Sequence, residues 1–423
     1  MPTLMPIKLH SPRTQNISLG LEITVYLLCF ITLIVALVDN NLSMKLYSVT
    51  AILGLLSIIF RGKPKNCNMQ YWLLPLAILL IGITDLIWYS VFKVDNSSFR
   101  STYHNYLNTA KIFIIGAILV LLVLSSKIKL KRETSLYIIY TLSFVIASYA
   151  FYIKSTTGAM RIDFGVGTAT GAAYSIMLVG ITSAVSILYT RHNHPVFFIL
   201  NIIAVFYALA LTQTRSSLLL LPIISALSLV LFYMKSPKKL FISVIGFLIL
   251  MTAFIAIFSK PLYDRYHQAI ADVNLYSNDN SNSSLGARFA MYEIGFDIFR
   301  ENPFAIRSAE SRAQRMAELA EKKTYLSGAL EYSNIHLHNE IIESASLKGV
   351  AGVISTIFLY IALFITIYKY KSLGLFAFTL AIIGTGLSDV IIWARSIPII
   401  MICAIVLLLF MEKIRNKDTN PID

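Results

Sequence analysis

The residues best suited to chemistry lie in one short segment, NIHLHNEIIES, at residues 334–344. The chain has only seven histidines, and two of them, His336 and His338, stand here one residue apart. Glu340 and Glu343 follow closely. Such a set could bind a metal ion or transfer a proton. If the segment is helical, its two histidines lie about 200° apart around the axis, so one metal ion could not bind both.

The spacing argues against a metal site. Zinc-binding helices place two histidines four residues apart, as in HExxH, and HLHNE lacks that spacing. The cysteines are remote from the segment, at Cys29, Cys67 and Cys403. We therefore expect no metal ion and no other cofactor. A single histidine that acts as a general base fits the residues better, because neutral imidazole accepts a proton near pH 7.

Spacing does not choose between the two histidines. A histidine base also needs an acid that orients it, and the chain offers four candidates: Glu340, Glu343, Asp85 and Asp389. The alternative interpretation is that both histidines are exposed loop residues without a catalytic role.

The composition indicates where this chemistry would take place. Hydrophobic residues make up 57% of the 423 residues and charged residues only 14%, which is too apolar for an ordinary soluble protein. Membrane-spanning helices need about 20 mostly apolar residues. The sequence therefore predicts an all-α polytopic membrane protein with about twelve spanning helices. The predicted spans are residues 20–38, 44–60, 71–92, 109–126, 135–153, 166–189, 195–213, 216–234, 240–258, 349–368, 373–392 and 396–411.

Basic residues predict how the chain is oriented. About half of the 36 Lys and Arg residues lie in the two tails and in alternate short connections between the spans. The positive-inside rule places this side, with both termini, in the cytoplasm. The rule also explains much of the net charge of +14 without a nucleic-acid partner.

Three regions follow from this pattern. Residues 1–258 hold spans one to nine, and residues 349–423 hold the last three spans and a cytoplasmic tail. Between them, residues 259–348 form a long hydrophilic loop on the outer face, which is the periplasm if the protein is bacterial.

Helices are also predicted within the outer loop. Ser284 can cap a helix over 285–300 that stops before Pro303. A second helix over 308–323 is expected to present a solvated face, and a third starts near Asn334. The first of these helices should carry an apolar stripe and, on another face, a polar set. The stripe is Leu285, Phe289, Phe296 and Phe299, and the other face holds Arg288, Tyr292 and Gly295.

Four charged residues stand at or near membrane depth, where charges are costly and are candidates for function. Asp85 and Asp389 fall toward the outer ends of spans three and eleven. Arg215 lies in the break TQTR between spans seven and eight, and Arg395 follows Trp393. All four should face the outer side, where the loop with Arg288 and the histidines also emerges.

Each of these charges has a structural alternative. The two arginines in the spans could extend to the membrane interface. Asp85 could pair with a cation inside the bundle, and Asp389 could cap a helix or hold Arg395. Arg288 could be a solvated charge on an amphipathic helix.

Arginines could bind the leaving group, which is the second requirement of a transfer reaction besides the base. The guanidinium fork fits phosphate oxygens, and a diphosphate leaving group needs its developing charge neutralised. Two arginines and one base at the outer membrane face therefore fit transfer from a lipid diphosphate to a hydroxyl group. The sequence has no Asp-x-Asp pair for a catalytic metal ion. We therefore expect a metal-independent reaction.

At these motifs the chain resembles the bacterial O-antigen ligases, the lipopolysaccharide core ligases, and enterobacterial members in particular. The motifs TQTR, LGAR and HLHNE carry the resemblance, together with their order and the large outer loop before span ten. It covers essentially the whole chain, including KVDNSSFRSTYHNYLNTAKIF, DFGVGTATGAAYS and GLSDVIIWARSIPII.

The resemblance implies a twelve-span enzyme of the GT-C type in the bacterial inner membrane. It implies transfer of a glycan from undecaprenyl diphosphate to a sugar hydroxyl of the lipid A-core, with inversion and without metal or nucleotide. By resemblance, Arg215 and Arg288 hold the diphosphate and His338 is the general base. Supporting roles are expected of Asp389, His336, Asp85 and Arg395. Besides these two substrates, the expected partner is membrane lipid.

Two alternatives remain open at this point. An O-antigen polymerase would use a second lipid-linked glycan as acceptor. A flippase for lipid-linked glycans would not be an enzyme, and it should carry charges at several depths and on both sides. The charges that lack a structural explanation here lie on one face, which argues against transport.

Overall fold

The computed structural model describes residues 12–61, 72–126, 131–257, 259–394 and 396–419. These residues form helices and connecting loops, without a β-strand among them. The expectation of an all-α fold is therefore confirmed. The helices are α1 (Pro12–Val35), α2 (Asn40–Arg61), α3 (Leu73–Phe92), α4 (Arg100–Ser125), α5 (Arg132–Tyr140), α6 (Leu142–Thr157), α7 (Ala169–Leu188), α8 (Pro195–Thr212), α9 (Arg215–Tyr233), α10 (Pro237–Ile257), α11 (Ser259–Ser277), α12 (Ser284–Glu301), α13 (Ala309–Lys322), the 3-10 helix η2 (Thr324–Tyr332), α14 (Glu340–Tyr370), α15 (Leu373–Gly386) and α16 (Ile397–Thr419).

Ten helical stretches in the described part of the chain are long and apolar enough to cross a membrane, and α5 and α6 together make one of them. α15 is a shorter apolar helix of 14 residues. α10 has 21 residues and coincides with the predicted ninth span. Each predicted span thus overlaps a helix, and the chain is a multi-pass membrane protein. The number of twelve spans and the GT-C type stay predictions.

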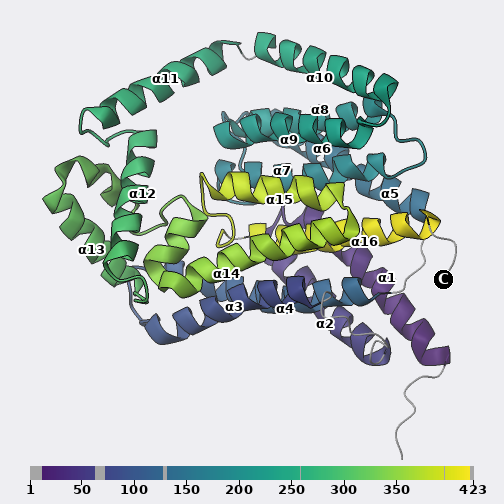
Figure 1. The fold of residues 1–423 in the computed structure, drawn as a ribbon, viewed down its shortest axis with the longest axis horizontal. Helices are drawn as coiled ribbons and strands as arrows, with labels where there is room; N and C mark the ends of the chain where they lie inside the picture. Colours follow the sequence, from purple (N-terminus) through teal and green to yellow (C-terminus); the bar gives the residue numbers. More distant parts are fainter. Residues whose placement is uncertain (1–11, 62–71, 127–130, 258, 395, 420–423) are drawn as a thin grey trace, which may run out of the picture.

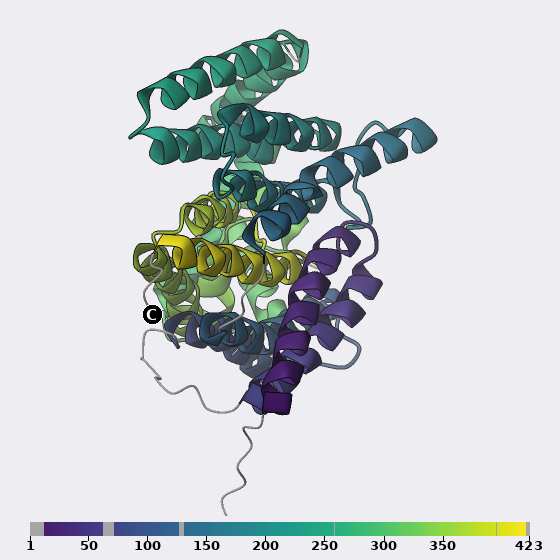
Figure 2. The same ribbon diagram turned by 90° about the vertical axis from the view of Figure 1, so that its right-hand side faces the viewer.

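Two helices form the centre of the bundle. In α7 and α16, 94% of the apolar window is buried inside the protein, against 33–61% in the other spanning helices. Figures 1 and 2 show α16 between the α3–α4 pair and the layer of α8, α9 and α10. α7 is rich in Ala, Gly and Ser. Such small residues let helices approach closely within a membrane, and Gly180 lies directly against Val205 of α8.

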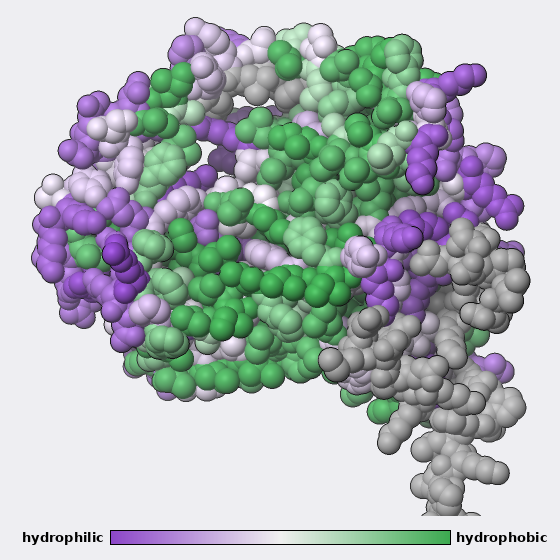
Figure 3. Space-filling view, in the orientation of Figure 1, coloured by the Kyte–Doolittle hydropathy of each residue, from purple (hydrophilic) through white to green (hydrophobic). Residues whose placement is uncertain are grey.

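The surface of the bundle has an apolar region and a hydrophilic region. Figure 3 shows apolar side chains over the middle of the molecule and hydrophilic side chains gathered at the end formed by α11, α12 and α13. Helices α12, α13 and η2 have a small core of their own, which includes Ala290, Met291, Ile294, Met316 and Leu326. We call this hydrophilic end, residues 259–339, the outer segment.

Helix α12 ends before Pro303 as predicted, but its cap and its buried face differ. The capping side chain is Ser283, which accepts a hydrogen bond from the Gly286 amide, rather than Ser284. The predicted apolar stripe is wrong, because Phe289 and Phe296 are 37% and 57% exposed. The buried face carries smaller side chains, among them Ala287, Ala290, Met291, Ile294 and Ile298. Gly295 lies on this side, against Leu337 and Ile342, where a larger side chain would clash.

The helix over 308–323 is confirmed as α13, yet it is not merely a solvated face. Arg312 and Met316 of α13 are fully buried. The helix predicted to start near Asn334 is wrong, because α14 begins at Glu340. The side chain of Asn339 caps it by accepting hydrogen bonds from two backbone amides of the first turn, each 3.1 Å long. Residues 333–339 are therefore a non-helical segment that ends at a helix cap.

Helix α14 is kinked at Gly349, whose φ of 57° lies in the left-handed region. A Cβ atom at this position would lie 2.4 Å from the carbonyl oxygen of Pro303. The chain of the outer segment runs alongside here, since the Val350 amide donates to that oxygen at 2.8 Å. The Arg307 amide donates to the Leu347 carbonyl, also at 2.8 Å. Only glycine fits both the backbone angle and this close approach.

Candidate active site

The two histidines lie on the same side of their segment and both face Asp389. His338 Nδ1 lies 3.0 Å from Asp389 Oδ1, and His336 Nε2 lies 3.7 Å from the same oxygen. The centroids of the two imidazole rings are 4.4 Å apart. The prediction that they face opposite ways is therefore wrong. It assumed a helix, whereas His338 has a left-handed φ of 50° that turns its side chain back toward His336.

Asp389 connects the histidines to two further helices. It lies in the loop between α15 and α16, and its second carboxylate oxygen accepts a hydrogen bond from the Tyr174 hydroxyl of α7 at 3.1 Å. That hydroxyl in turn accepts one from Ser216 of α9 at 3.2 Å. Burial tends to raise the pKa of Asp389, but the hydrogen bonds from His338 and from the Val390 amide outweigh it and lower the pKa below its usual range. Asp389 is thus a carboxylate that orients His338.

Burial lowers the pKa of His336, and the nearby charge of Asp389 opposes this shift. These surroundings favour the neutral form of the His336 imidazole. Its ring contacts the same carboxylate at a longer distance, so it fits a supporting position better than that of the oriented base.

Arg215 is the first residue of α9, as the break TQTR predicted. α8 ends at Thr212, and Gln213 takes a left-handed φ of 55° before α9 starts. Arg215 is partly buried and its guanidinium donates to Gln268 of α11 at 3.1 Å. It directly precedes Ser216, the end of the hydrogen-bonded chain from His338. The N-terminus of α9 adds the positive end of a helix dipole at the same place.

Arg288 approaches the histidines from α12. It is partly buried and lies one turn before Tyr292, on the same face. The Tyr292 hydroxyl can donate to the carbonyl oxygen of His338 at 2.9 Å or of Leu387 at 3.1 Å. Burial raises the pKa of Tyr292, and the charge of Arg288 opposes this. Arg288 therefore belongs to the surroundings of the histidines and is not a remote solvated charge.

Two carboxylates on the first turn of α14 hold the segments that carry the site. Glu343 binds the histidine segment by accepting the Leu337 amide at 2.9 Å. The same buried carboxylate forms an ion pair of 2.6 Å with Arg312 and accepts the Tyr106 hydroxyl at 3.0 Å. Arg312 was missed from the sequence, because its helix has the composition of a solvated face.

Glu340 likewise holds the loop that carries Asp389, by accepting backbone amides of that loop. One of its carboxylate oxygens accepts the amides of Ile391 and Ile392 at 3.1 and 2.9 Å. The other accepts the Tyr360 hydroxyl. Both glutamates were candidates for the acid that orients the base, but neither contacts an imidazole ring in the recorded hydrogen bonds. Asp389 takes that position, and the glutamates fix the backbone on its two sides.

Asp85 lies away from the histidines, in a buried ion pair of 2.6 Å with Lys348 of α14. It also accepts the indole N–H of Trp393 at 2.6 Å. The Lys348 ammonium lies 4.1 Å from the centre of the Trp393 ring. Asp85 thus ties α3 and α14 to the loop between α15 and α16, which is the structural alternative named for it. Arg395 lies outside the described residues.

His336, His338 and Asp389 are also the one group of three or more potential metal ligands in the described part of the chain. Their ligand atoms lie within 4.8 Å of one another. The 3.0 Å contact between His338 Nδ1 and Asp389 Oδ1 has the length of a hydrogen bond. A metal-independent site stays a prediction.

Comparison with known proteins identifies the family. The chain is 57% identical to the O-antigen ligase of Escherichia coli K12 over 419 residues, which cover 99% of this chain and all of that protein. The chain belongs to the O-antigen ligase family. As a member of it, the protein is an enzyme, a ligase of the glycosyltransferase type. The family model, described as O-antigen ligase, matches residues 199–357.

The matched range of the O-antigen ligase family contains both arginines and both histidines of the site. Asp389 and Tyr174 lie outside it, in helices and loops that the fold brings to the same place. A more distant relative is an uncharacterised protein of Haemophilus influenzae, 26% identical over 246 residues, which are 56% of this chain and 60% of that protein.

Proposed function

We propose that this protein transfers the O-antigen polysaccharide from undecaprenyl diphosphate to a sugar hydroxyl of the lipid A-core. The reaction takes place on the periplasmic face of the bacterial inner membrane, and both termini are cytoplasmic. The observation that supports this most strongly is the hydrogen bond of 3.0 Å between His338 of the outer segment and Asp389. The outer segment also carries Arg288, and Asp389 is linked through Tyr174 to Ser216, the residue after Arg215.

His338 is proposed as the general base. Its Nδ1 donates to the Asp389 carboxylate, so the lone pair of the neutral ring lies on Nε2. Nε2 takes the proton of the acceptor hydroxyl as its oxygen attacks the anomeric carbon of the donor sugar. The bond between that carbon and the diphosphate oxygen breaks, and a single displacement inverts the anomeric centre.

Arg215 and Arg288 are proposed to bind the diphosphate. The leaving group gains negative charge as the glycosidic bond breaks, and a guanidinium fork can bind two of its oxygens at once. One arginine comes from the start of α9 and the other from α12, so they can reach the diphosphate from two sides. The glycosyl–diphosphate linkage of the donor is already activated, because diphosphate is a good leaving group, so no nucleotide is needed.

Reconstitution tests the proposal. Purified protein, lipid-linked polysaccharide and lipid A-core are combined in vesicles, and the product is resolved by gel and by mass spectrometry. We expect polysaccharide on the lipid A-core only when both substrates are present, with an inverted linkage. Elongation of one lipid-linked glycan by another would instead indicate a polymerase. Movement of the donor between leaflets without any covalent product would indicate a flippase.

A further inference from the structure

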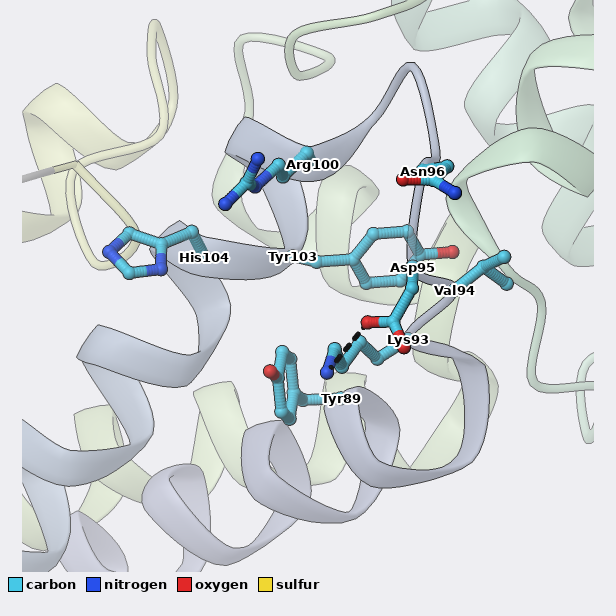
Figure 4. A pocket seen from close by; sticks show the side chains of 8 residues that line it. All are labelled: Tyr89, Lys93, Val94, Asp95, Asn96, Arg100, Tyr103 and His104. Carbon is cyan, nitrogen blue, oxygen red and sulfur yellow. Dashed lines mark ion pairs between the residues drawn. The ribbon is translucent and has the colours of Figure 1, made fainter.

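A pocket lies at the outer end of the α3–α4 hairpin, apart from the histidines. It has a volume of about 330 Å³ and is lined from both helices and from the turn between them. Figure 4 shows Arg100 of α4 on one side of it, Tyr89 of α3 and Lys93 at the end of that helix on the other, and the Tyr103 ring between them. His104 stands at its edge.

The charge of this pocket is mainly positive. Lys93 pairs with Asp95, the one carboxylate of the lining, at 2.9 Å. The Asp95 side chain is 86% exposed, and an exposed pair of this kind contributes little stability. Within the part of the chain that the structure describes, no hydrogen bond or ion pair is recorded for the side chains of Arg100 and His104. The Arg100 guanidinium and the His104 ring are therefore available to a ligand.

The orientation of the protein does not account for cations at this place. The positive-inside rule concentrates Lys and Arg on the cytoplasmic side. The hairpin lies at the opposite end, because the Trp88 indole donates to the Arg307 carbonyl of the outer segment at 2.8 Å. The Tyr103 hydroxyl likewise donates to Glu310 of α13 at 2.5 Å. A basic pocket at this end needs another explanation, and an anionic ligand supplies it.

The lining indicates which anion. The Arg100 fork and the Lys93 ammonium suit a phosphate group. The rings of Tyr89 and Tyr103 offer flat apolar faces next to these charges, as a sugar ring would require. Val94, which lines the pocket, is 60% exposed, and Val91 nearby on α3 is 66% exposed, so both would face lipid at this level. The pocket therefore fits a phosphorylated sugar on a lipid anchor.

The helix that carries Arg100 and His104 also contacts the histidine segment through its buried face. Thr102 lies between Arg100 and His104 in the first turns of α4, and its hydroxyl donates to the Asn334 carbonyl at 3.4 Å. Asn334 precedes His336 by two residues. A ligand held at the start of α4 is thus close to the segment that carries the base.

We propose that this pocket binds a phosphate group on the sugars of the membrane-anchored acceptor and so presents the acceptor hydroxyl to His338. The inference rests on the proposed function, since it assigns a site to the acceptor glycolipid of that reaction. The two pairs of cations then have different roles. Arg215 and Arg288 bind the donor diphosphate. Lys93 and Arg100 select the acceptor.

The test is a double variant, Lys93→Gln with Arg100→Gln, in the full-length protein in vesicles. Arg300→Gln with Lys322→Gln is the matched control, because it removes one Arg and one Lys from exposed positions of the outer segment. We expect at least a 10-fold rise in KM for the phosphorylated acceptor, with kcat and the donor KM unchanged. The control should behave as the unmodified protein. An unchanged acceptor KM in the double variant would overturn the proposal.

Dephosphorylated acceptor identifies the group that is bound. The unmodified protein should show the same raised KM with this acceptor, and the double variant should show no further change. An equal loss in the variant with both acceptors would refute phosphate binding. Inhibition by added phosphatidylglycerol that disappears in the variant would assign the pocket to phospholipid headgroups and would also overturn the proposal.

Acceptor binding without donor, measured by native mass spectrometry, separates this inference from the proposed function. Weaker binding of phosphorylated acceptor by the variant supports the pocket even if transfer fails, and equal binding contradicts it.

Discussion

Replacing Glu340 by alanine should strongly lower the activity of the enzyme, although Glu340 itself does not contact substrate in the proposed reaction. Glu340 is fully buried and accepts the amides of Ile391 and Ile392, two and three residues after Asp389. Each buried amide left without an acceptor costs about 1–3 kcal/mol. Two such groups would cost roughly 2–6 kcal/mol if the loop stayed in place. The loop will therefore shift to recover these hydrogen bonds, and Asp389 will shift with it.

The expected loss of activity follows from how far Asp389 moves. A displacement of about 1 Å in a catalytic arrangement lowers the rate on the order of 100-fold. We expect that loss in kcat for Glu340→Ala, because His338 loses its oriented partner. Glu340→Gln keeps a carbonyl oxygen at the same place and exchanges a charged acceptor for a neutral one, at about 1 kcal/mol per hydrogen bond. Its kcat should fall less than that of Glu340→Ala, by at most about 30-fold if the whole cost of about 2 kcal/mol for the two bonds raised the barrier.

The assay is transfer in vesicles with both substrates saturating, scaled to the amount of monodisperse protein. Glu412→Ala is the matched control, since Glu412 is equally buried but lies near the opposite end of the bundle, where it accepts the Tyr189 hydroxyl at 2.5 Å. It should lose protein yield and keep kcat. Full kcat in Glu340→Ala would refute the positioning argument, and so would an equal loss of kcat in the Glu412 control.

Further predictions concern the groups at the site itself. His338→Ala should abolish transfer while the protein remains in the membrane, and His336→Ala should be milder; equal loss at both positions would indicate a paired role. Asp389→Asn should lower kcat by on the order of 1,000-fold without changing the donor KM, because an amide can hold the wrong tautomer of His338; a change in donor KM alone would contradict this. Arg215→Lys should lose most activity if the fork binds two oxygens, and full activity would indicate a simple interfacial charge. Transfer measured with excess chelator should be unchanged, and loss that zinc restores would assign a metal to the two histidines and Asp389.

The sequence predicts what depends on local patterns. Long apolar runs gave the spanning helices, and Pro303 marked the end of α12. The break before Arg215 was visible because TQTR interrupts two apolar runs. In each case the determining residues are neighbours in the chain, so spacing carries the information.

The rest depends on contacts between distant residues. The His338–Asp389 hydrogen bond joins positions 51 apart, and no spacing rule selects Asp389 over the other acids. The helix expected from Asn334 is wrong because the left-handed His338 and the cap at Asn339 delay its start to Glu340. Arg312 is charged in a helix of solvated composition, and only the buried partner Glu343 reveals its place.

The central position of α16 has a consequence for how the protein is made. This helix follows all the other described helices in the chain, yet 94% of its apolar window is covered by them. It packs against α1, α4 and α7, which reach the membrane much earlier. We therefore expect that the earlier helices leave a space between them that lipid occupies until α16 displaces it. Asp389 lies in the loop that leads into α16, so we expect it to reach its place beside His338 only when α16 is inserted.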